Sequence, residues 1–118
     1  MKPIKEKPIN EKTIEETETF TQMVADKQGW ILTHDKGFFD DLASGLQINW
    51  NRYGYFLCPC RDTEGSREAD ADVLCPCRYA KTDIQRYGHC FCSLYWSKEF
   101  VASGKAPTGI PERRGRRD

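Results

Sequence analysis

The sequence lacks cysteine outside residues 58–92, and it lacks any long apolar run. No stretch approaches the roughly 20 apolar residues that a membrane-spanning helix needs, so we expect no membrane partner. Residues 1–12 mix lysine, glutamate and proline without the apolar segment of a secretory signal peptide. We therefore expect a cytoplasmic protein, in which clustered cysteines are more typical of metal binding or redox catalysis than of structural disulfides.

An excess of either charge is also missing. Lys and Arg total 18, and Asp and Glu total 18, so the formal net charge is zero. This balance gives no reason to expect nucleic acid or an anionic membrane surface as a partner. The length of 118 residues predicts one small domain.

Helical spacing of apolar residues predicts an all-α fold, meaning a small, mainly helical domain with irregular loops around its cysteines. The expected helices run over residues 11–28, from a cap at Thr33 or Asp35 to Gly54, over residues 79–87, and from a cap at Ser97 to Gly104. The second helix carries an apolar stripe that we interpret as core, formed by Phe39, Leu42, Leu46, Trp50 and Tyr53. Residues 30–33 are expected to be a connector.

These patterns divide the chain into three parts. Residues 1–10 are expected to form a flexible lead, residues 11–104 a single domain, and residues 105–118 a basic tail. The tail is interpreted as solvated rather than as a docking patch, and its arginines are Arg113, Arg114, Arg116 and Arg117.

All six cysteines form Cys-x-Cys pairs: a first pair (Cys58 and Cys60), a middle pair (Cys75 and Cys77) and a last pair (Cys90 and Cys92). In an extended chain, residues i and i+2 point to the same side about 6.6 Å apart, which suits two corners of an iron–sulfur cubane. Prolines inside the first two pairs favour this extended conformation. A disulfide prefers Cα atoms about 5.5–6 Å apart with converging side chains, so we expect any disulfide to join different pairs.

Four cysteines saturate a [4Fe-4S] cluster, and the remaining two can form a dithiol/disulfide couple. A four-cysteine zinc site usually has two to four residues between paired ligands, whereas the spacers here are single residues. A ferredoxin would show cysteines separated by two residues, and a disulfide-rich secreted domain would need a signal peptide. A thioredoxin would carry Cys-x-x-Cys, which this chain lacks. Spacing alone does not say which four cysteines bind a cluster.

The wider sequence resembles the catalytic subunit of ferredoxin:thioredoxin reductase, from about Leu32 to Arg114. The resemblance lies in the phrases GLQINWNRYGYFLCPCR, CPCRYA and GHCFC, which are quoted in chain order. It implies a [4Fe-4S] cluster bound by Cys58, Cys75, Cys77 and Cys90. It also implies an active-site disulfide between Cys60 and Cys92, in which Cys60 is the exposed thiol that attacks the partner and Cys92 stays against the cluster.

By the same resemblance, the chain would be a ferredoxin-dependent disulfide reductase. It would accept electrons one at a time from a ferredoxin-type donor and pass them to a thioredoxin- or glutaredoxin-like disulfide protein, with a second small subunit as a further candidate partner. Arg61 and Arg78 are candidates for lowering the pKa of Cys60, although both can also be ordinary solvated arginines. Two alternatives stay open: a cluster-bearing electron carrier or sensor without disulfide turnover, and a zinc-binding interaction module.

The sequence departs from the family pattern at Phe91, where the plant and cyanobacterial enzymes have a histidine that transfers protons. His89 shares a face with residue 91 in an extended chain, so we hypothesise that it serves as a proton-transfer helper. The alternative is a surface or helix-end histidine, which is also the interpretation of His34. Loops of 14 and 12 residues separate the three pairs and also depart from the family, so the partner need not be a conventional thioredoxin.

Overall fold

The structure, a computed structural model, describes residues 11–111. The expected flexible lead at residues 1–10 and the arginines from Arg113 onward lie outside this range. The described elements are α1 (Ile14–Gln28), β1 (Ile31–Leu32), α2 (Lys36–Tyr53), the 3₁₀ turn η1 (Ala71–Val73), α3 (Ala80–Tyr87), β2 (Tyr95–Trp96) and α4 (Lys98–Ser103). Helices dominate them, so the mainly helical character is confirmed.

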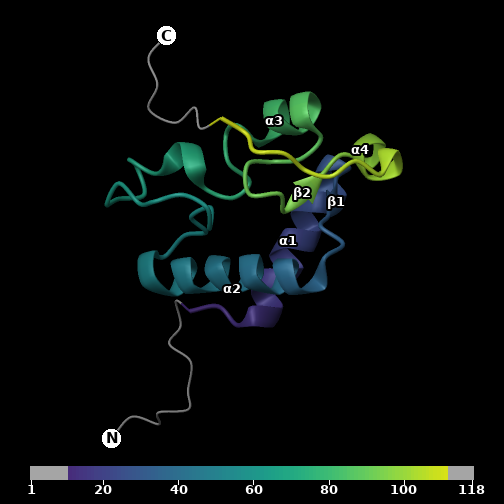
Figure 1. The fold of residues 1–118 in the computed structure, drawn as a ribbon. Coiled ribbons are helices and arrows are strands. Elements are labelled where there is room, and N and C mark those ends of the chain that lie inside the picture. The colour runs from purple at the N-terminus through teal and green to yellow at the C-terminus, as the bar shows by residue number, and fades with distance from the viewer. Residues whose placement is uncertain (1–10, 112–118) are drawn as a thin grey trace, which may run out of the picture.

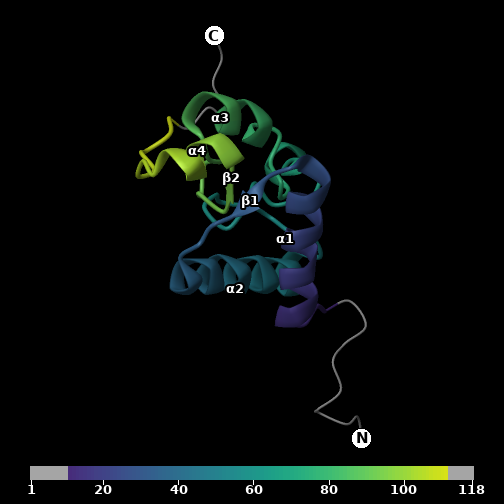
Figure 2. The same cartoon turned by 90° about the vertical axis from the view of Figure 1, so that its right-hand side faces the viewer.

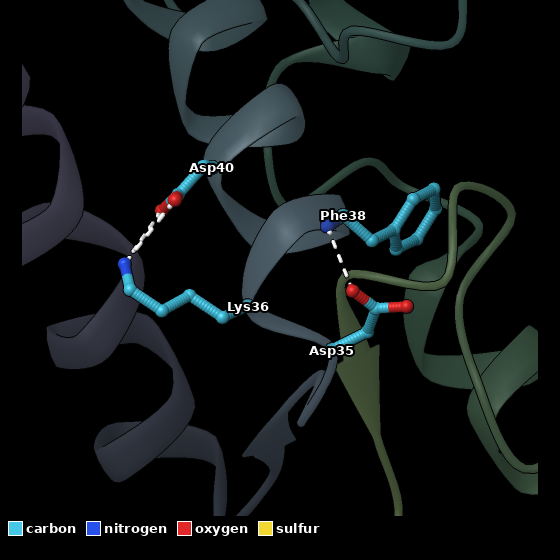
Figure 3. Close-up of polar contacts among 4 residues, drawn as sticks. All are labelled: Asp35, Lys36, Phe38 and Asp40. Atoms are coloured by element: carbon cyan, nitrogen blue, oxygen red, sulfur yellow. Dashed lines mark hydrogen bonds and ion pairs between the residues drawn. The ribbon is translucent and has the colours of Figure 1, made fainter.

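Local capping explains where the first two helices begin. The Thr13 hydroxyl accepts from the Glu16 amide at 3.0 Å, and the Glu16 carboxylate accepts from the Thr13 amide at 2.8 Å, which is a capping box at the start of α1. The Asp35 carboxylate accepts from the Phe38 amide at 3.0 Å at the start of α2 (Figure 3). Of the two caps proposed for α2, Asp35 is therefore the one used.

The helix α2 lies at one end of the molecule and α3 lies at the other, while α1 crosses α2 and extends toward the short strands between them (Figures 1 and 2). Val24 and Ala25 of α1 belong to the same buried core as Leu42 and Leu46 of α2. Phe39 and Trp50 pack against that core, whereas Tyr53 packs against a smaller cluster that includes Tyr55. The predicted apolar stripe of α2 is thus confirmed as a packing face, divided between two clusters.

A small sheet departs from the all-α expectation. Ile31 pairs with Trp96 and Leu32 with Tyr95, in an antiparallel arrangement of β1 and β2. The amide of Thr33 extends the ladder by donating to the Leu94 carbonyl at 2.9 Å. The expected connector at residues 30–33 is therefore partly a strand, and it ties the first half of the chain to the segment that follows the last cysteine pair.

The segment after α4 runs back against the cysteine-containing half. Ile110 is buried, and the Thr108 amide donates to His89 Nε2 at 3.2 Å. Residues 105–111 therefore contact the domain, although the division of the chain at residue 104 stays a prediction. Among residues 11–111, no helix combines the length and the hydropathy that crossing a bilayer requires.

Candidate functional site

Backbone pairing brings the first and middle cysteine pairs together. The Cys58 amide donates to the Val73 carbonyl at 2.9 Å, and the Cys75 amide donates to the Phe56 carbonyl at 2.8 Å. These bonds flank an isolated antiparallel bridge between residues 57 and 74. The two pairs therefore lie side by side although 14 residues separate them in the sequence.

The helix α2 packs against the segment that carries the first pair. Asn49 donates its side-chain amide to the Leu57 carbonyl at 2.9 Å, directly before Cys58. One turn earlier on the same face, a Cβ atom on Gly45 would lie only 3.0 Å from Cβ of Pro59. The small residue at position 45 thus allows the Cys-Pro-Cys turn to rest directly on the helix.

The last pair is positioned by the end of α3 and by β2. Gly88 ends α3 in the left-handed region with φ of 91°, and His89 then forms an isolated antiparallel bridge with Trp96. The Cys90 amide donates to the Tyr95 carbonyl at 2.9 Å. The small sheet therefore determines where the last pair enters the site.

Five of the six cysteines line one small cavity. Its walls are Cys58, Cys75, Pro76, Cys77, Ala80, Cys90, Phe91, Cys92 and Tyr95. The five cysteines are buried, whereas Cys60 is exposed and does not line the cavity. The structure thus brings together the four predicted cluster ligands and Cys92, and it leaves the predicted attacking thiol at the surface.

The sulfur of Cys92 lies at the centre of the thiol contacts. It is 3.9 Å from Cys58 Sγ and 3.9 Å from Cys90 Sγ. A hydrogen bond from Cys92 is the largest cause that lowers the pKa of Cys60, while hydrogen bonds with Cys58, Cys60 and Cys90 raise that of Cys92. Because the thiolate is the nucleophile in disulfide exchange, Cys60 is both the accessible thiol and one that ionises more readily than a free cysteine.

Burial affects the remaining cysteines in different ways. Desolvation raises the pKa of Cys75 well above its ordinary value, and it raises that of Cys77 to about 11 against the opposing charge of Arg61. A hydrogen bond with Cys92, together with backbone hydrogen bonds, lowers the pKa of Cys90 to about 7. The hydroxyl of Tyr95 lies 3.5 Å from Cys75 Sγ. No pattern in the sequence indicated that Tyr95 contacts this site.

The two candidate arginines have opposite environments. Arg61 is 7% exposed, with its guanidinium carbon 4.2 Å from the centre of the Phe91 ring and its Nη2 4.0 Å from Cys77 Sγ. The alternative of a solvated arginine is therefore wrong for Arg61. Arg78 is exposed, so the same alternative describes its environment.

His89 is 1% exposed, so a surface position is wrong, but it directly follows Gly88 at the end of α3, as the helix-end alternative expected. Its Nε2 accepts the Thr108 amide, and its Nδ1 lies 2.8 Å from the Cys90 carbonyl and therefore donates to it. Both ring nitrogens thus contact backbone atoms. His34 is exposed, as expected.

A larger cavity of about 480 Å³ lies elsewhere, beside the start of α2, with Phe38 and Trp96 in its wall. It contains no cysteine. Among residues 11–111, no three or more His, Cys, Asp or Glu side chains are arranged as a site for a metal ion. The cysteine-lined cavity nevertheless offers sulfur donors within mainly apolar walls, and this donor set suits thiolate-bound iron–sulfur chemistry.

This small, mainly helical domain gathers five thiols around one cavity and exposes a sixth, whose pKa is lowered. Such an arrangement is typical of thiol-based redox proteins. The sequence model described as the ferredoxin thioredoxin reductase catalytic beta chain matches residues 7–112. The chain belongs to this family, which confirms the resemblance inferred from the sequence.

Three relatives are named ferredoxin-thioredoxin reductase catalytic chain, chloroplastic. The Arabidopsis thaliana protein is 28% identical over 101 residues (84% of this chain, 66% of the relative). The Spinacia oleracea protein is 29% identical over 108 residues (89% and 70%), and the Glycine max protein is 27% identical over 101 residues (84% and 67%). The chain thus spans about two thirds of the length of these relatives. Their names are those of an oxidoreductase, as expected, and because they are chloroplastic the cytoplasmic location stays a prediction.

Proposed function

We propose that this chain is an iron–sulfur disulfide reductase. It accepts electrons one at a time from a ferredoxin-type donor and reduces the disulfide of a thioredoxin- or glutaredoxin-like protein. The observation that carries this proposal is the division of the thiols: five buried cysteines line one cavity, while Cys60 is exposed and forms a hydrogen bond with Cys92.

The cysteines have distinct roles in this proposal. Cys58, Cys75, Cys77 and Cys90 bind a [4Fe-4S] cluster, which when bound supplies one-electron chemistry beside a two-electron disulfide. The Cys60 thiolate attacks the partner disulfide, which forms a mixed disulfide and releases one partner thiolate. The Cys92 thiolate then attacks the Cys60 sulfur, so that the second partner thiol leaves and the Cys60–Cys92 disulfide forms. Two electrons from the donor and two protons restore the two thiols.

The contact between Cys60 and Cys92 favours disulfide turnover over the alternative of an electron carrier or sensor. A carrier needs no exposed thiol with a lowered pKa next to a buried second thiol. A second small subunit is a candidate partner in this proposal, and the prediction that nucleic acid and membranes are not partners belongs to it as well.

Anaerobic purification followed by iron, sulfide and zinc analysis tests the cofactor. We expect a brown protein with about four irons and four sulfides per chain. A colourless protein that contains zinc and no sulfide would contradict the proposal and support the zinc-binding module.

Single serine variants test the division of the thiols. Cys60→Ser and Cys92→Ser are expected to keep the visible absorption and to lose reduction of a thioredoxin disulfide. Cys77→Ser is expected to lose the absorption itself. If Cys60→Ser turned over normally, the electron carrier would be the better description.

The proton-transfer role of His89 stays a prediction. The backbone contacts of both ring nitrogens support a positioning role instead, because neither nitrogen lies free beside a thiol. His89→Asn separates the two roles. An unchanged rate and pH profile of disulfide reduction would exclude proton transfer by His89.

A further inference from the structure

The side chain of Arg61 contacts residues from separate parts of the thiol centre. Arg61 directly follows Cys60, and its backbone amide donates to the Cys58 carbonyl at 3.1 Å. Its guanidinium lies over the ring of Phe91, which separates Cys90 from Cys92. The same group reaches Cys77 Sγ of the middle pair at 4.0 Å. One side chain therefore connects the first, middle and last cysteine pairs.

A second aromatic ring fixes the guanidinium. The Tyr79 ring centre lies 5.1 Å from the Arg61 guanidinium carbon, and the Tyr79 hydroxyl donates to the Asp72 carboxylate at 2.7 Å. A cation over the face of an aromatic ring is attracted to it, and the attraction strengthens when water is excluded. With Arg61 7% exposed, both ring contacts are largely shielded from solvent.

The environment also accounts for the burial of a permanent charge. An unpaired guanidinium in an apolar interior is strongly unfavourable, so a buried arginine indicates compensating negative charge or electron density nearby. Two rings and the Cys77 sulfur lie against the guanidinium and contribute to that compensation.

We propose that Arg61 is a positioning residue of the thiol centre. By stacking on Phe91 it clamps the first cysteine pair to the last and keeps Cys60 next to Cys92, and it places a positive charge beside the cysteine-lined cavity. The clamp stands on the contacts alone, whereas an effect of this charge on an iron–sulfur centre rests on the proposed function.

Arg78 is a matched control within the same chain. Both arginines follow a Cys-Pro-Cys sequence, but Arg78 is exposed and Arg61 is buried. An effect of general charge or of the Cys-Pro-Cys-Arg sequence would appear in variants of both residues. An effect of the clamp would appear only at Arg61.

The experiment compares Arg61→Met, Arg61→Lys, Phe91→Leu and Arg78→Met in the full chain as purified anaerobically. The first measurement is the equilibrium constant for forming the Cys60–Cys92 disulfide in a glutathione redox buffer. Trapping the free thiols at equilibrium gives the fraction of disulfide. Loss of a shielded cation–ring contact is expected to lower this constant roughly tenfold in Arg61→Met and in Phe91→Leu. The double variant Arg61→Met/Phe91→Leu is expected to lower the constant little further than either single change, because the two residues act through one contact.

The second measurement is the reduction potential of the iron–sulfur centre, read from its visible and EPR spectra. Arg61→Met is expected to shift it to more negative values, since a nearby positive charge favours the reduced centre. Arg61→Lys keeps the charge without the planar stack. Its reduction potential should therefore lie close to the wild-type value, while its disulfide constant should stay below the wild-type value. Arg78→Met should leave both measurements unchanged.

Equal values for Arg61→Met and Arg78→Met in both measurements would overturn the inference. Should Arg61→Met fail to fold, Arg61→Lys and Phe91→Leu still test the clamp, and a wild-type disulfide constant in both would also overturn it. The disulfide measurement does not depend on which metal the chain contains. A zinc-loaded protein would therefore contradict the proposed function while leaving the clamp to be decided by the disulfide constants.

Discussion

Asp70 shows how a single buried carboxylate shapes the loop that follows Cys60. It is fully buried, and its Oδ2 accepts from the Tyr55 hydroxyl at 2.5 Å and from the Thr63 hydroxyl at 2.6 Å. Its Oδ1 accepts from the Glu64 amide at 2.7 Å. These bonds attach the loop after Cys60 to the buried residues that precede Cys58.

Replacing Asp70 with Asn is therefore expected to destabilise the domain. The amide nitrogen cannot accept a hydrogen bond, so one of the three donors is left without its partner inside the protein. We expect a loss of about 1–3 kcal/mol in the free energy of unfolding, measured by chemical denaturation. Glu68→Gln, an exposed change in the same loop, should stay within about 0.5 kcal/mol of the wild type. Equal denaturation midpoints for the two variants would contradict the role of Asp70.

Tyr55 predicts a pH dependence at the alkaline end. Burial and the hydrogen bond to Asp70 raise the pKa of Tyr55 above its ordinary value of 10.0. Above pH 10 the unfolded chain releases this proton while the folded chain keeps it, so the stability contributed by Tyr55 is full below that pH and falls as the pH rises. Tyr55→Phe removes the group, and the free energy of unfolding is expected to fall less steeply above pH 10 than in the wild type. Parallel curves for the two proteins would exclude this linkage.

At the scale of elements, the end of α3 is under a tighter constraint than the other helix ends. Gly88 has φ of 91°, and a Cβ atom there would lie 2.2 Å from Cγ of Phe100 in α4. Gly104 has φ of 71°, but a Cβ atom there would meet nothing within 4 Å. Gly88 thus serves both the backbone turn and the contact between α3 and α4, whereas Gly104 serves the turn alone.

Alanine variants at the two glycines separate these effects. Gly104→Ala is expected to cost about 1–2 kcal/mol, from the left-handed backbone alone. Gly88→Ala adds the clash with Phe100, so we expect a further loss of about 1–3 kcal/mol and a displaced last cysteine pair. Thermal denaturation gives the difference in stability, and the rate of thiol labelling at Cys60 and Cys92 reports the displacement. Equal losses in the two variants would mean that α4 moves away without cost.

The helices could be predicted from the sequence because their ends carry local signals. Asp35, Gly54 and Ser97 act through backbone geometry and hydrogen bonds within a few residues, which sequence spacing can reveal. The strands β1 and β2 could not be predicted, since two residues are too short to show an alternating pattern.

The candidate site could likewise be predicted only where the signal is local or shared with the family. The grouping of the cysteines follows from their spacing and from the family resemblance. The burial of Arg61 and His89 depends on partners distant in the sequence, such as Phe91 and Thr108. No local sequence pattern predicts such contacts.

On the scale of the whole molecule, the thiol centre is part of the core rather than an addition to its surface. Five cysteines belong to the same buried cluster as Leu42 and Leu46 of α2 and Val24 of α1. The helix α2 lies at one end of the molecule and α1 crosses it (Figures 1 and 2), and the cysteine-bearing segments share a core with both helices. A cofactor bound by these thiols would therefore be one of the groups around which the domain folds.

If the thiols bind the proposed iron–sulfur cluster, removing it is accordingly expected to destabilise the cysteine-bearing half of the domain first. Extraction with an iron chelator and a mild oxidant, followed by removal of both reagents, gives the protein to compare. A domain of this size loses roughly 4–8 °C in Tm for each kcal/mol, and metal ligation contributes several, so we expect Tm to fall by at least about 10 °C. Amide hydrogen exchange should quicken over residues 55–96, while α1 and α2 keep more of their protection. Equal loss of protection in both halves would mean that the centre supports the domain as one cooperative unit, and an unchanged Tm would mean that the fold does not depend on it.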